Sequence, residues 1–554
     1  MSKSDFQAKI KVLLFFMLMM GCGPQPQVHL GFTLPTKPSA LTGRCDLNPN
    51  PQTPFVGEVT TLRMVTYPNS EGDILAQEAA MGESLSIENL PIDQTYDVTL
   101  YGKNASNTEI WRGTTHDVVV QKDQTTQVNI LLGRIRDLSC ARTVQPEARA
   151  FHTATLLKSG HVLLVGGAQT MQATNSCNGC QTLSATGAIS IFDPGTGTIA
   201  TQGQLNTARM LHTATLLSDG SVLIVGGTTT ASINPEEPFP IVPDENGLVQ
   251  QIEVINPDTL LSTILGDDVG GPRVFHSALK TISGKIIIAG GIQSRVSPFN
   301  LANATSSTMI CDEATLVCQL GPALAQPRAG HVMFEMENEL VFTWGGSVGT
   351  SYQLERLDAS LTTASLLNVA AMAEDRNLFF ASAATYNSNR MLMAGGLIRR
   401  SDGTFSLATA SYYSESTGPL YVYMPEYGTS GGISIGNTSP EDDPPPFAIL
   451  GPSFMGQATS LGDGARVMIS GGFGTLNMTP VTHMSLFDER MVAVLRPAND
   501  VAELTLTQER AGHTVVNLGT GQLLITGGLS TNADTGSSSI ATTTTIYTDE
   551  KEVR

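Results

Sequence analysis

Charged side chains are scarce in this sequence, and basic ones are scarcer than acidic ones. Only 15% of the 554 residues are charged, and 50 acidic residues against 31 basic ones leave a formal net charge of −19. A chain this acidic repels the phosphate backbone of nucleic acids. The sequence therefore argues against a nucleic-acid partner.

Aromatic residues and catalytic motifs are also few. Aromatics make up 6% of the chain, whereas hydrophobic residues make up 41% and glycine alone contributes 54 residues. This composition favours an extracytoplasmic all-β protein over a helical cytosolic enzyme. The sequence contains no G-x-S-x-G, no H-E-x-x-H and no phosphate-cradling loop, so none of these common active-site signatures is present.

Long hydrophobic runs are missing as well. The apolar run at residues 12–20, VLLFFMLMM, has nine residues, whereas a membrane-spanning helix needs about twenty. It follows three lysines and fits the hydrophobic region of a signal peptide, so residues 1–22 are expected to be a targeting segment. No other stretch is suited to span a membrane.

The end of this segment, Met19-Met20-Gly21-Cys22, resembles a bacterial lipobox. The resemblance implies that Cys22 is the lipidated first residue of the mature protein. Because Gly23 rather than Asp follows, it also implies an envelope location at the outer membrane, with the lipid as the only membrane contact. The alternative is an ordinary secretory signal with a cysteine nearby.

One nineteen-residue phrase recurs through the rest of the chain. In each full copy an Arg leads, a His follows three residues later and a Gly pair closes at a constant offset. Two weaker copies end at Gly395-Gly396 and Gly471-Gly472, which makes seven units. The full copies are residues 149–167, 209–227, 273–291, 328–346 and 510–528.

The pattern within one unit predicts four antiparallel strands. Two apolar runs, such as 154–157 and 161–165, flank a short turn with Gly, which is typical of a hairpin. The second run is apolar at consecutive positions, so we expect it to be covered on both faces. The Gly pair marks backbone that needs positive φ or a close neighbour. Third and fourth strands follow, which makes each unit one blade of a β-propeller.

The spacing of the His, the double Gly and the later F-D-P strand resembles the kelch repeat, in the looser form of bacterial galactose-oxidase-type propellers. The resemblance implies a seven-bladed kelch-like β-propeller over residues 136–554. One architecture hosts many activities, so the resemblance bears weakly on function.

The region before the repeats has a different pattern. Residues 23–33 are predicted to be a tether, and residues 34–135 contain short strand-like runs separated by turn residues, as in a β-sandwich. The stretch at 84–102 loosely resembles small prealbumin-like or Ig-like domains. The last unit has no fourth strand, so we predict that residues 137–143 complete its sheet and remove a free edge.

Seven cysteines are an odd number, and lipidation of Cys22 would leave six for pairing in an oxidising compartment. Cys311 and Cys318 flank a turn between two predicted strands and should bond. The second pair closes a C-x-x-C loop, for which a zinc or thioredoxin-like site lacks the expected context. We predict a local disulfide there, and the remaining two cysteines would tie the small domain to the closing strand. These pairs are Cys177–Cys180 and Cys45–Cys140.

The repeated His residues occupy identical places, so we expect one shared packing or hydrogen-bond role rather than a metal site, and likewise for the leading Arg residues. By resemblance, galactose oxidase holds copper with two His, two Tyr and a Cys cross-linked to one Tyr. The tyrosines here cluster without a matching His pair, so no catalytic residue, metal or cofactor is expected. The residues concerned are His152, His212, His276, His331 and His513, with Tyr412, Tyr413, Tyr421 and Tyr423.

The longest insertions, residues 228–249 and 426–452, should emerge on one face of the propeller. Long loops on a rigid scaffold are common recognition elements, although they could equally be tolerated surface decoration. Their carboxylates show no calcium-ligand spacing. The candidate binding residues are Glu236, Glu237, Asp244 and Glu245 in the first loop and Glu441, Asp442 and Asp443 in the second.

Together these patterns predict an envelope-anchored binding protein for protein or carbohydrate partners, without catalysis. The alternative is a carbohydrate-active enzyme, either a sugar oxidase or a sialic-acid mutarotase of the kelch type.

Overall fold

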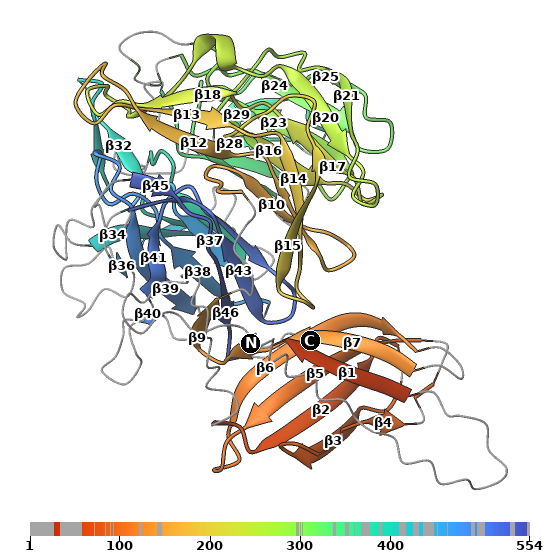
Figure 1. Ribbon diagram of the computed structural model, residues 1–554. Helices are drawn as coiled ribbons and strands as arrows, with labels where there is room; N and C mark the ends of the chain where they lie inside the picture. The colour runs from red at the N-terminus through yellow and green to blue at the C-terminus, as the bar shows by residue number, and fades with distance from the viewer. Residues whose placement is uncertain are drawn as a thin grey trace, which may run out of the picture.

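The computed structural model describes residues 27–33 and most of 58–550. Between residues 58 and 550, the larger gaps are residues 141–146, 367–376, 409–416, 425–431, 436–447, 496–504 and 532–537. The expected targeting segment and Cys22 lie outside the described residues. None of the helices in the described part of the chain is both long and apolar enough to cross a membrane. The fold is all-β, built from many small antiparallel sheets (Figure 1), with a short 3-10 helix, η1 (Glu245–Gly247).

The first described strands form two sheets, which we call the N-terminal unit. One sheet has the order β3-β2-β5-β6-β8, and the other has the order β4-β1-β7. Met64 and Val98 from the first sheet share a buried cluster with Val128 and Ile130 of the second. The strands are β1 (Gln27–Thr33), β2 (Thr61–Pro68), β3 (Leu75–Ala80), β4 (Ile87–Glu88), β5 (Thr95–Lys103), β6 (Glu109–Val119), β7 (Thr125–Leu131) and β8 (Gly133–Arg134).

Strand β1 differs from the expected tether at residues 23–33. Residues 27–33 pair in parallel with β7 along its whole length. The segment alternates apolar Val28, Leu30 and Phe32 with other residues, a period that fits a half-buried strand. The predicted tether therefore shortens to residues 23–26.

Each of the seven sequence units contributes one meandering sheet (Figure 1). Unit 1 is β10 (Thr153–Leu156), β11 (Val162–Val165), β14 (Ala188–Asp193) and β15 (Thr198–Gln204), and unit 2 is β16 (Thr213–Leu216), β17 (Val222–Val225), β20 (Gln251–Ile255) and β21 (Ser262–Asp267). Unit 3 is β22 (Ser277–Lys280), β23 (Lys285–Ala289), β24 (Thr308–Asp312) and β25 (Cys318–Leu320). Unit 4 is β26 (Val332–Glu335), β27 (Val341–Trp344), β28 (Glu355–Leu357) and β29 (Ala364–Leu366).

In the part of the chain that the structure describes, units 5 and 6 each carry one strand beyond the meander, and unit 7 has three strands in its sheet. Unit 5 is β30 (Ser382–Tyr386), β31 (Arg390–Ala394), β34 (Thr417–Met424) and β35 (Gly432–Ile435), with β36 (Ala448–Leu450). Unit 6 is β37 (Gln457–Ser460), β38 (Arg466–Ser470), β39 (Val481–Asp488) and β40 (Ala493–Leu495), with β41 (Thr505–Arg510). Unit 7 is β42 (Thr514–Asn517), β43 (Gln522–Thr526) and β46 (Thr544–Thr548).

The second strand of a unit is covered on both faces, as predicted. Every residue of β11, β17, β27, β38 and β43 is buried. Leu163 and Val165 of β11 share a cluster with Val222 and Ile224 of β17. Neighbouring sheets thus bury each other's apolar faces, because a single sheet in water could not cover both of its own.

The Gly pairs join neighbouring units. The N–H of the second Gly in each pair donates to the carbonyl of the residue that leads the next unit, and the last unit donates back to the first, which closes a circle. The bonds are Gly167 to Arg209 (2.9 Å), Gly227 to Arg273 (2.8 Å), Gly291 to Arg328 (2.8 Å), Gly346 to Leu378 (2.9 Å), Gly396 to Ser453 (2.7 Å), Gly472 to Arg510 (2.7 Å) and Gly528 to Arg149 (2.7 Å).

The segment that precedes unit 1 lies beside the last strand of unit 7. Strand β9 (Asp137–Cys140) contacts β46, and the Arg136 N–H donates to the Thr548 carbonyl at 2.8 Å. Both ends of the repeat region therefore meet at unit 7.

In the described residues, three further sheets lie outside the seven repeat sheets and the two sheets of the N-terminal unit. The sequence did not predict them. The loops after the second strands of units 1 and 2 combine into one sheet, ordered β12-β13-β18-β19. Similar hairpins follow the second strands of units 5 and 7. The strands are β12 (Ala168–Ala173), β13 (Gln181–Ala185), β18 (Thr230–Ile233), β19 (Ile241–Pro243), β32 (Leu397–Arg399), β33 (Phe405–Leu407), β44 (Leu529–Thr531) and β45 (Ser538–Ile540).

The N-terminal unit docks on unit 7 through hydrogen bonds from buried side chains. Arg112 donates from Nη2 to the Asp549 carbonyl at 2.8 Å, and Gln522 donates from Nε2 to the Leu131 carbonyl at 3.2 Å. The Asp549 carboxylate in turn binds the buried guanidinium of Arg466 in unit 6. These contacts fix the N-terminal unit to the repeat ring.

His116 adds a titratable contact to this junction. Its Nδ1 lies 2.9 Å from Oδ2 of Asp97 and its Nε2 lies 3.1 Å from the carbonyl oxygen of Gly519 in unit 7. Only the imidazolium form donates to both acceptors. The hydrogen bond with Asp97 raises the pKa of His116 above its usual value, although partial burial opposes this. Burial acts to raise the pKa of Asp97, but the bond and charge of His116 outweigh it and hold that pKa low.

These shifts predict a pH-dependent junction. Since the pKa of His116 is raised on folding, its contribution to stability is full below about pH 6.5 and is lost as the pH rises through the folded value. The Asp97 contribution is lost only as the pH falls through its own lowered pKa. We expect the thermal midpoint of wild type to fall between mildly acidic and alkaline pH more steeply than that of His116→Gln. Parallel curves for the two proteins would contradict this prediction.

Candidate binding site in the central channel

The inner strands of the ring enclose a pocket of about 430 Å³, which we call the central pocket. Its volume lies within the range of about 300–1,000 Å³ that is common for ligand sites. The first strand of each unit and the residues just before it supply the lining. The lining residues used below are Phe151, Phe275, Phe380, Thr153, Thr155, Thr213, Thr514 and Gln457.

The floor of the pocket is made by the residue that stands just before the His position in each unit. All seven of these residues have positive φ, between 54° and 60°. Backbone hydrogen bonds link them around the axis, for example Phe380 N–H to the Gly330 carbonyl and Met455 N–H to the Phe380 carbonyl. They are Phe151, Leu211, Phe275, Gly330, Phe380, Met455 and Gly512.

A buried phenylalanine from the loop sheet seals this floor from behind. Phe239, between β18 and β19, stacks on Phe380 with ring centroids 4.7 Å apart and meets Phe275 edge-on at 5.7 Å. The sequence placed this segment in a recognition loop, but the described residues Phe239, Ile241 and Val242 are buried in the cluster behind the floor. The central pocket is closed at this end and opens at the other, where the inner strands pass into their hairpin turns.

The wall of the pocket is neutral and rich in hydroxyl groups. Thr153, Thr155, Thr213 and Thr514 lie along the inner strands, with Gln457 contributing an amide. Hydroxyl and amide groups can both donate and accept hydrogen bonds. The pocket thus combines an apolar floor, in which three of the seven residues are Phe, with a polar, uncharged wall.

The imidazoles of the repeated phrase bridge neighbouring units. Nε2 of His212 lies 3.0 Å from Thr153 Oγ1, Nε2 of His276 lies 2.9 Å from Thr213 Oγ1, and His152 returns to Thr514 of unit 7 at 2.9 Å. Burial, with nearby Arg charges, lowers the pKa of His152 to about 3. These rings are neutral at physiological pH and serve the hydrogen-bond role that the sequence predicted.

His331 and His513 are similarly buried, and their pKa values are lowered by burial to about 3. His513 bonds Ser470 of unit 6 at 3.1 Å, whereas unit 4 is joined differently, by the Ser277 hydroxyl donating to the His331 carbonyl. In the weaker copies, Ala381 and Gly456 stand at the His position.

The leading Arg residues stabilise the ends of the second strands. In all five full copies Nη1 donates to the carbonyl of the first Gly of the same unit. The acceptors are Gly166 (3.2 Å) for Arg149, Gly226 (3.2 Å) for Arg209, Gly290 (3.1 Å) for Arg273, Gly345 (2.8 Å) for Arg328 and Gly527 (2.7 Å) for Arg510.

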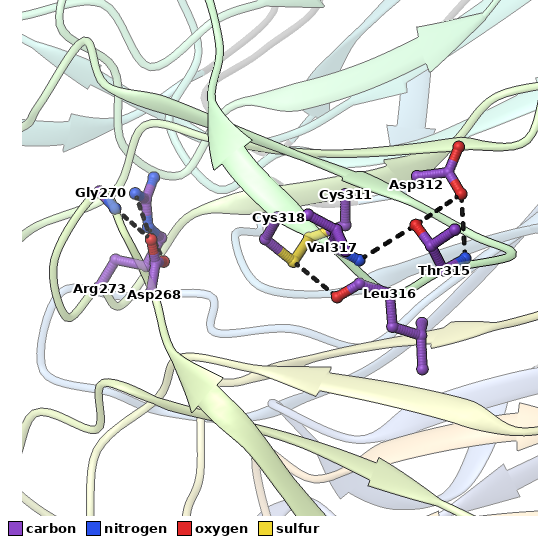
Figure 2. Close-up of a disulfide and its surroundings, with 9 residues drawn as sticks. All are labelled: Asp268, Gly270, Arg273, Cys311, Asp312, Thr315, Leu316, Val317 and Cys318. Atoms are coloured by element: carbon purple, nitrogen blue, oxygen red, sulfur yellow. Dashed lines mark hydrogen bonds and ion pairs between the residues drawn. A yellow bond between two sulfur atoms is a disulfide. The ribbon is translucent and has the colours of Figure 1, made fainter.

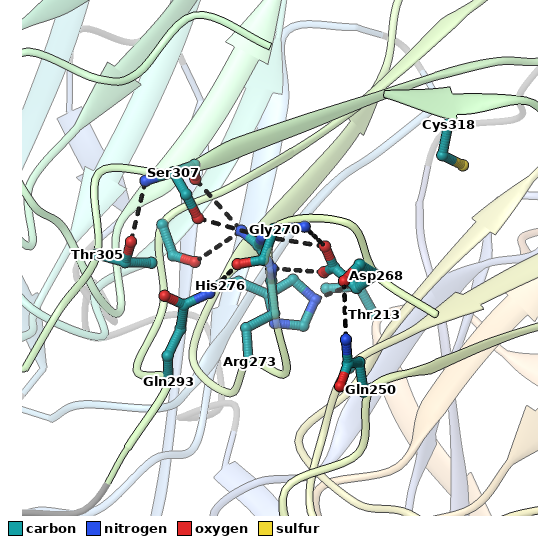
Figure 3. Close-up of polar contacts among 12 residues, drawn as sticks. Thr213, Gln250, Asp268, Gly270, Arg273, His276, Gln293, Thr305, Ser307 and Cys318 are labelled. Carbon is teal, nitrogen blue, oxygen red and sulfur yellow. Dashed lines mark hydrogen bonds and ion pairs between the residues drawn. The ribbon is translucent and has the colours of Figure 1, made fainter. Parts of the chain in front are cut away.

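These buried guanidinium groups differ in their other partners. Arg209 pairs with Glu253 and Arg328 with Glu355, from the third strand of the same unit. Arg273 instead binds Asp268, and Figure 3 shows Gln250 and Ser307 completing this network. Such partners stabilise buried charges, which explains why carboxylates occur inside an otherwise apolar ring. Arg510 instead donates to the hydroxyls of Thr543 and Thr545.

The cysteine pairs fall largely where the sequence placed them. Cys311 and Cys318 are directly opposed on β24 and β25 and form a disulfide with a Cα–Cα distance of 4.0 Å (Figure 2). Cys177 and Cys180 are bonded in the turn between β12 and β13. Cys140 is also disulfide-bonded, and its predicted partner Cys45 lies outside the described residues.

The candidate loop carboxylates have mostly local contacts. Asp244 caps η1 by accepting from the Asn246 N–H, and Glu237 accepts from the Phe299 N–H at 2.6 Å. Glu236 and Glu245 are exposed. Their binding role stays a prediction, as does that of Glu441, Asp442 and Asp443, which lie outside the described residues.

Comparison with known proteins adds little beyond this geometry. No protein-family model matches the chain, and no curated protein sequence does. A solved structure of a fungal alcohol oxidase of the AA5 family, in complex with copper, is 14% identical over 75% of this chain and 76% of that one, with a TM-score of 0.48. The copper and the oxidase activity belong to that protein.

Three imidazoles that line the central pocket already have hydrogen-bond partners at Nε2. The Nε2 atoms of His152, His212 and His276 are each bonded to a hydroxyl of a different unit. Within the described ranges, no three or more His, Cys, Asp or Glu residues are grouped to hold a metal ion. Tyr421 and Tyr423 belong to β34, while Tyr412 and Tyr413 lie outside the described residues.

Proposed function

We propose that this chain is a non-catalytic binding protein of the bacterial cell envelope, and that its central pocket takes a neutral, hydroxyl-rich ligand of the carbohydrate class. The observation that carries the proposal is the lining of the pocket, an apolar floor with three phenylalanines beneath an uncharged wall of hydroxyl and amide groups. Sugars offer a C–H face that packs on aromatic rings and a rim of hydroxyls that both donate and accept.

The chemistry of the pocket suits binding better than proton transfer. A general acid or base works best with a pKa near the working pH. Burial holds the pKa of His152 and His513 at about 3, and both rings bond across unit boundaries. Their role is to hold the wall in place, which favours a preformed binding site.

We further propose that the repeat region is a seven-bladed kelch-like propeller and that the N-terminal unit is a β-sandwich. The circle of bonds from each Gly pair to the next unit supports the first assignment, and the cluster shared by two sheets supports the second. Residues 137–143 would complete the last blade, since β9 lies beside β46. A lipid on Cys22 would anchor the chain, and the disulfides suit an oxidising compartment outside the cytoplasm.

A glycan array with the full chain tests the proposal. We expect wild type to bind a neutral oligosaccharide, and Thr155→Trp, which fills the central pocket, to lose that binding. Asn246→Trp is the control, because this exposed residue lies on the opposite face and should leave binding unchanged.

Two results would contradict the proposal. One is equal glycan binding by wild type and Thr155→Trp. The other is copper at one equivalent in the purified protein together with oxidation of a sugar, which would establish the enzymatic alternative instead.

A further inference from the structure

We infer that the mouth of the central pocket faces the membrane that carries the lipid anchor, so that its ligand is presented from the membrane side. This inference rests on the proposed lipid on Cys22 and goes beyond it by assigning an orientation. Three features of the chain carry it: the position of β1, the length of the tether, and the face on which the N-terminal unit docks.

Strand β1 begins at the end of the N-terminal unit that is remote from the repeat ring. It runs parallel to β7, with Gln27 opposite Thr125 and Thr33 opposite Leu131. Leu131 is the end that contacts the ring, because its carbonyl accepts from Gln522 of unit 7. The six residue steps from Gln27 to Thr33 (33 − 27) span about 20 Å, so Gln27, opposite Thr125, lies about that far from the docking end. Figure 1 shows β1 and β7 side by side in the N-terminal unit.

The tether is shorter than the distance between Gln27 and the end of the N-terminal unit that docks on the ring. From Cys22 to Gln27 there are five residue steps (27 − 22), which reach at most about 17 Å when fully extended. A lipid on Cys22 therefore holds the remote end of the N-terminal unit at the bilayer surface. The repeat ring stands beyond it, on the far side of the N-terminal unit.

The N-terminal unit docks on the face of the ring where the pocket opens. His116 contacts Gly519, and Leu131 contacts Gln522; both partners belong to or adjoin the hairpin turn between β42 and β43. Equivalent turns, such as the one at Ser159 in unit 1, surround the mouth. The opposite face is closed by Phe239 behind the floor. The mouth therefore looks along the N-terminal unit toward the membrane.

Energy transfer to labelled lipids tests this orientation. The lipidated full chain is placed on vesicles that contain rhodamine-labelled headgroups, with a donor dye at Ser159→Cys on the mouth face or at Asn246→Cys on the opposite face. Both residues are exposed. We expect several-fold more efficient transfer from position 159 than from position 246. Both labelled variants should unfold at the same temperature as the unlabelled chain, which would show that they are folded.

A variant with about twenty Gly and Ser residues inserted before Gln27 provides the control, since a flexible linker of that length frees the orientation. We expect the two positions to give equal transfer in that variant. Equal or reversed transfer in the native chain would overturn the orientation while leaving glycan binding intact. Absence of lipid on Cys22 by mass spectrometry would overturn it as well, whereas loss of glycan binding alone would count only against the proposed function.

Discussion

Substitution of Gly226 by alanine is expected to destabilise the protein by about 3–5 kcal/mol, because it combines a left-handed backbone with overpacking. Gly226 has φ +67°, and a Cβ atom there would lie 2.5 Å from both the Arg273 carbonyl oxygen and His276 Cε1. Both contacts belong to the next unit, so neither can move without opening the boundary between units 2 and 3. The free energy of unfolding, or the shift in thermal midpoint, measures the effect.

Gly220 in the same unit provides a matched control. It has φ +94°, but a Cβ atom there would meet nothing within 4 Å. Gly220→Ala should therefore lower the free energy of unfolding by only about 1–2 kcal/mol, the cost of holding a residue with a side chain in a left-handed backbone conformation. Equal losses for the two variants would mean that close packing between units contributes little at the Gly pair.

Removal of the Glu253 carboxylate is the second large effect. Glu253→Ala is expected to cost about 3–5 kcal/mol, since it leaves the guanidinium of Arg209 buried without its counter-charge. Both side chains are 0% exposed. The same carboxylate accepts from the Asn206 and Thr207 N–H groups and from the Ser262 hydroxyl, so these groups would also lose a partner. Thermal unfolding at neutral pH checks the prediction.

In the first unit a hydroxyl group occupies the place of the Glu253 carboxylate, and the counter-charge, Glu147, lies farther away, with its Oε2 3.5 Å from Arg149 Nη2. There Arg149 donates to the Ser190 hydroxyl at 2.6 Å. Ser190→Ala should destabilise the protein by about 1.5–3 kcal/mol, the value of a hydrogen bond to a charged group, because the Glu147 counter-charge stays in place. If the Ser190 and Glu253 variants lost the same stability, the buried ion pair would not contribute as we propose.

Features that repeat could be predicted from the sequence, because the same residue types recur at the same spacing in each unit. Positive φ at the Gly pairs, full burial of the second strands and the structural roles of Arg and His all follow from a constant spacing. The Cys311–Cys318 bond followed from its place on two facing strands. Each of these features depends on residues that are close together in the sequence, within two neighbouring strands and the turn between them.

The floor of the pocket and the loop sheet could not be predicted in the same way. The floor positions hold Phe, Leu, Gly and Met, so their shared backbone conformation has no shared residue type. Phe239 reaches the floor only because strands from two different loops pair with each other, which is a long-range contact without a sequence period. Strand β1 was missed because its seven residues stand alone next to a stretch rich in Pro.

The bond from Gly528 to Arg149 has a consequence for biosynthesis. A nascent chain that has emerged only as far as unit 6 offers the first unit no neighbour on one side, and its apolar sheet face stays uncovered until the C-terminal forty or so residues arrive. If the chain is exported as we propose, its translocation would be complete before the circle could form, and a chaperone outside the cytoplasm would bind an open set of sheets with an uncovered apolar face.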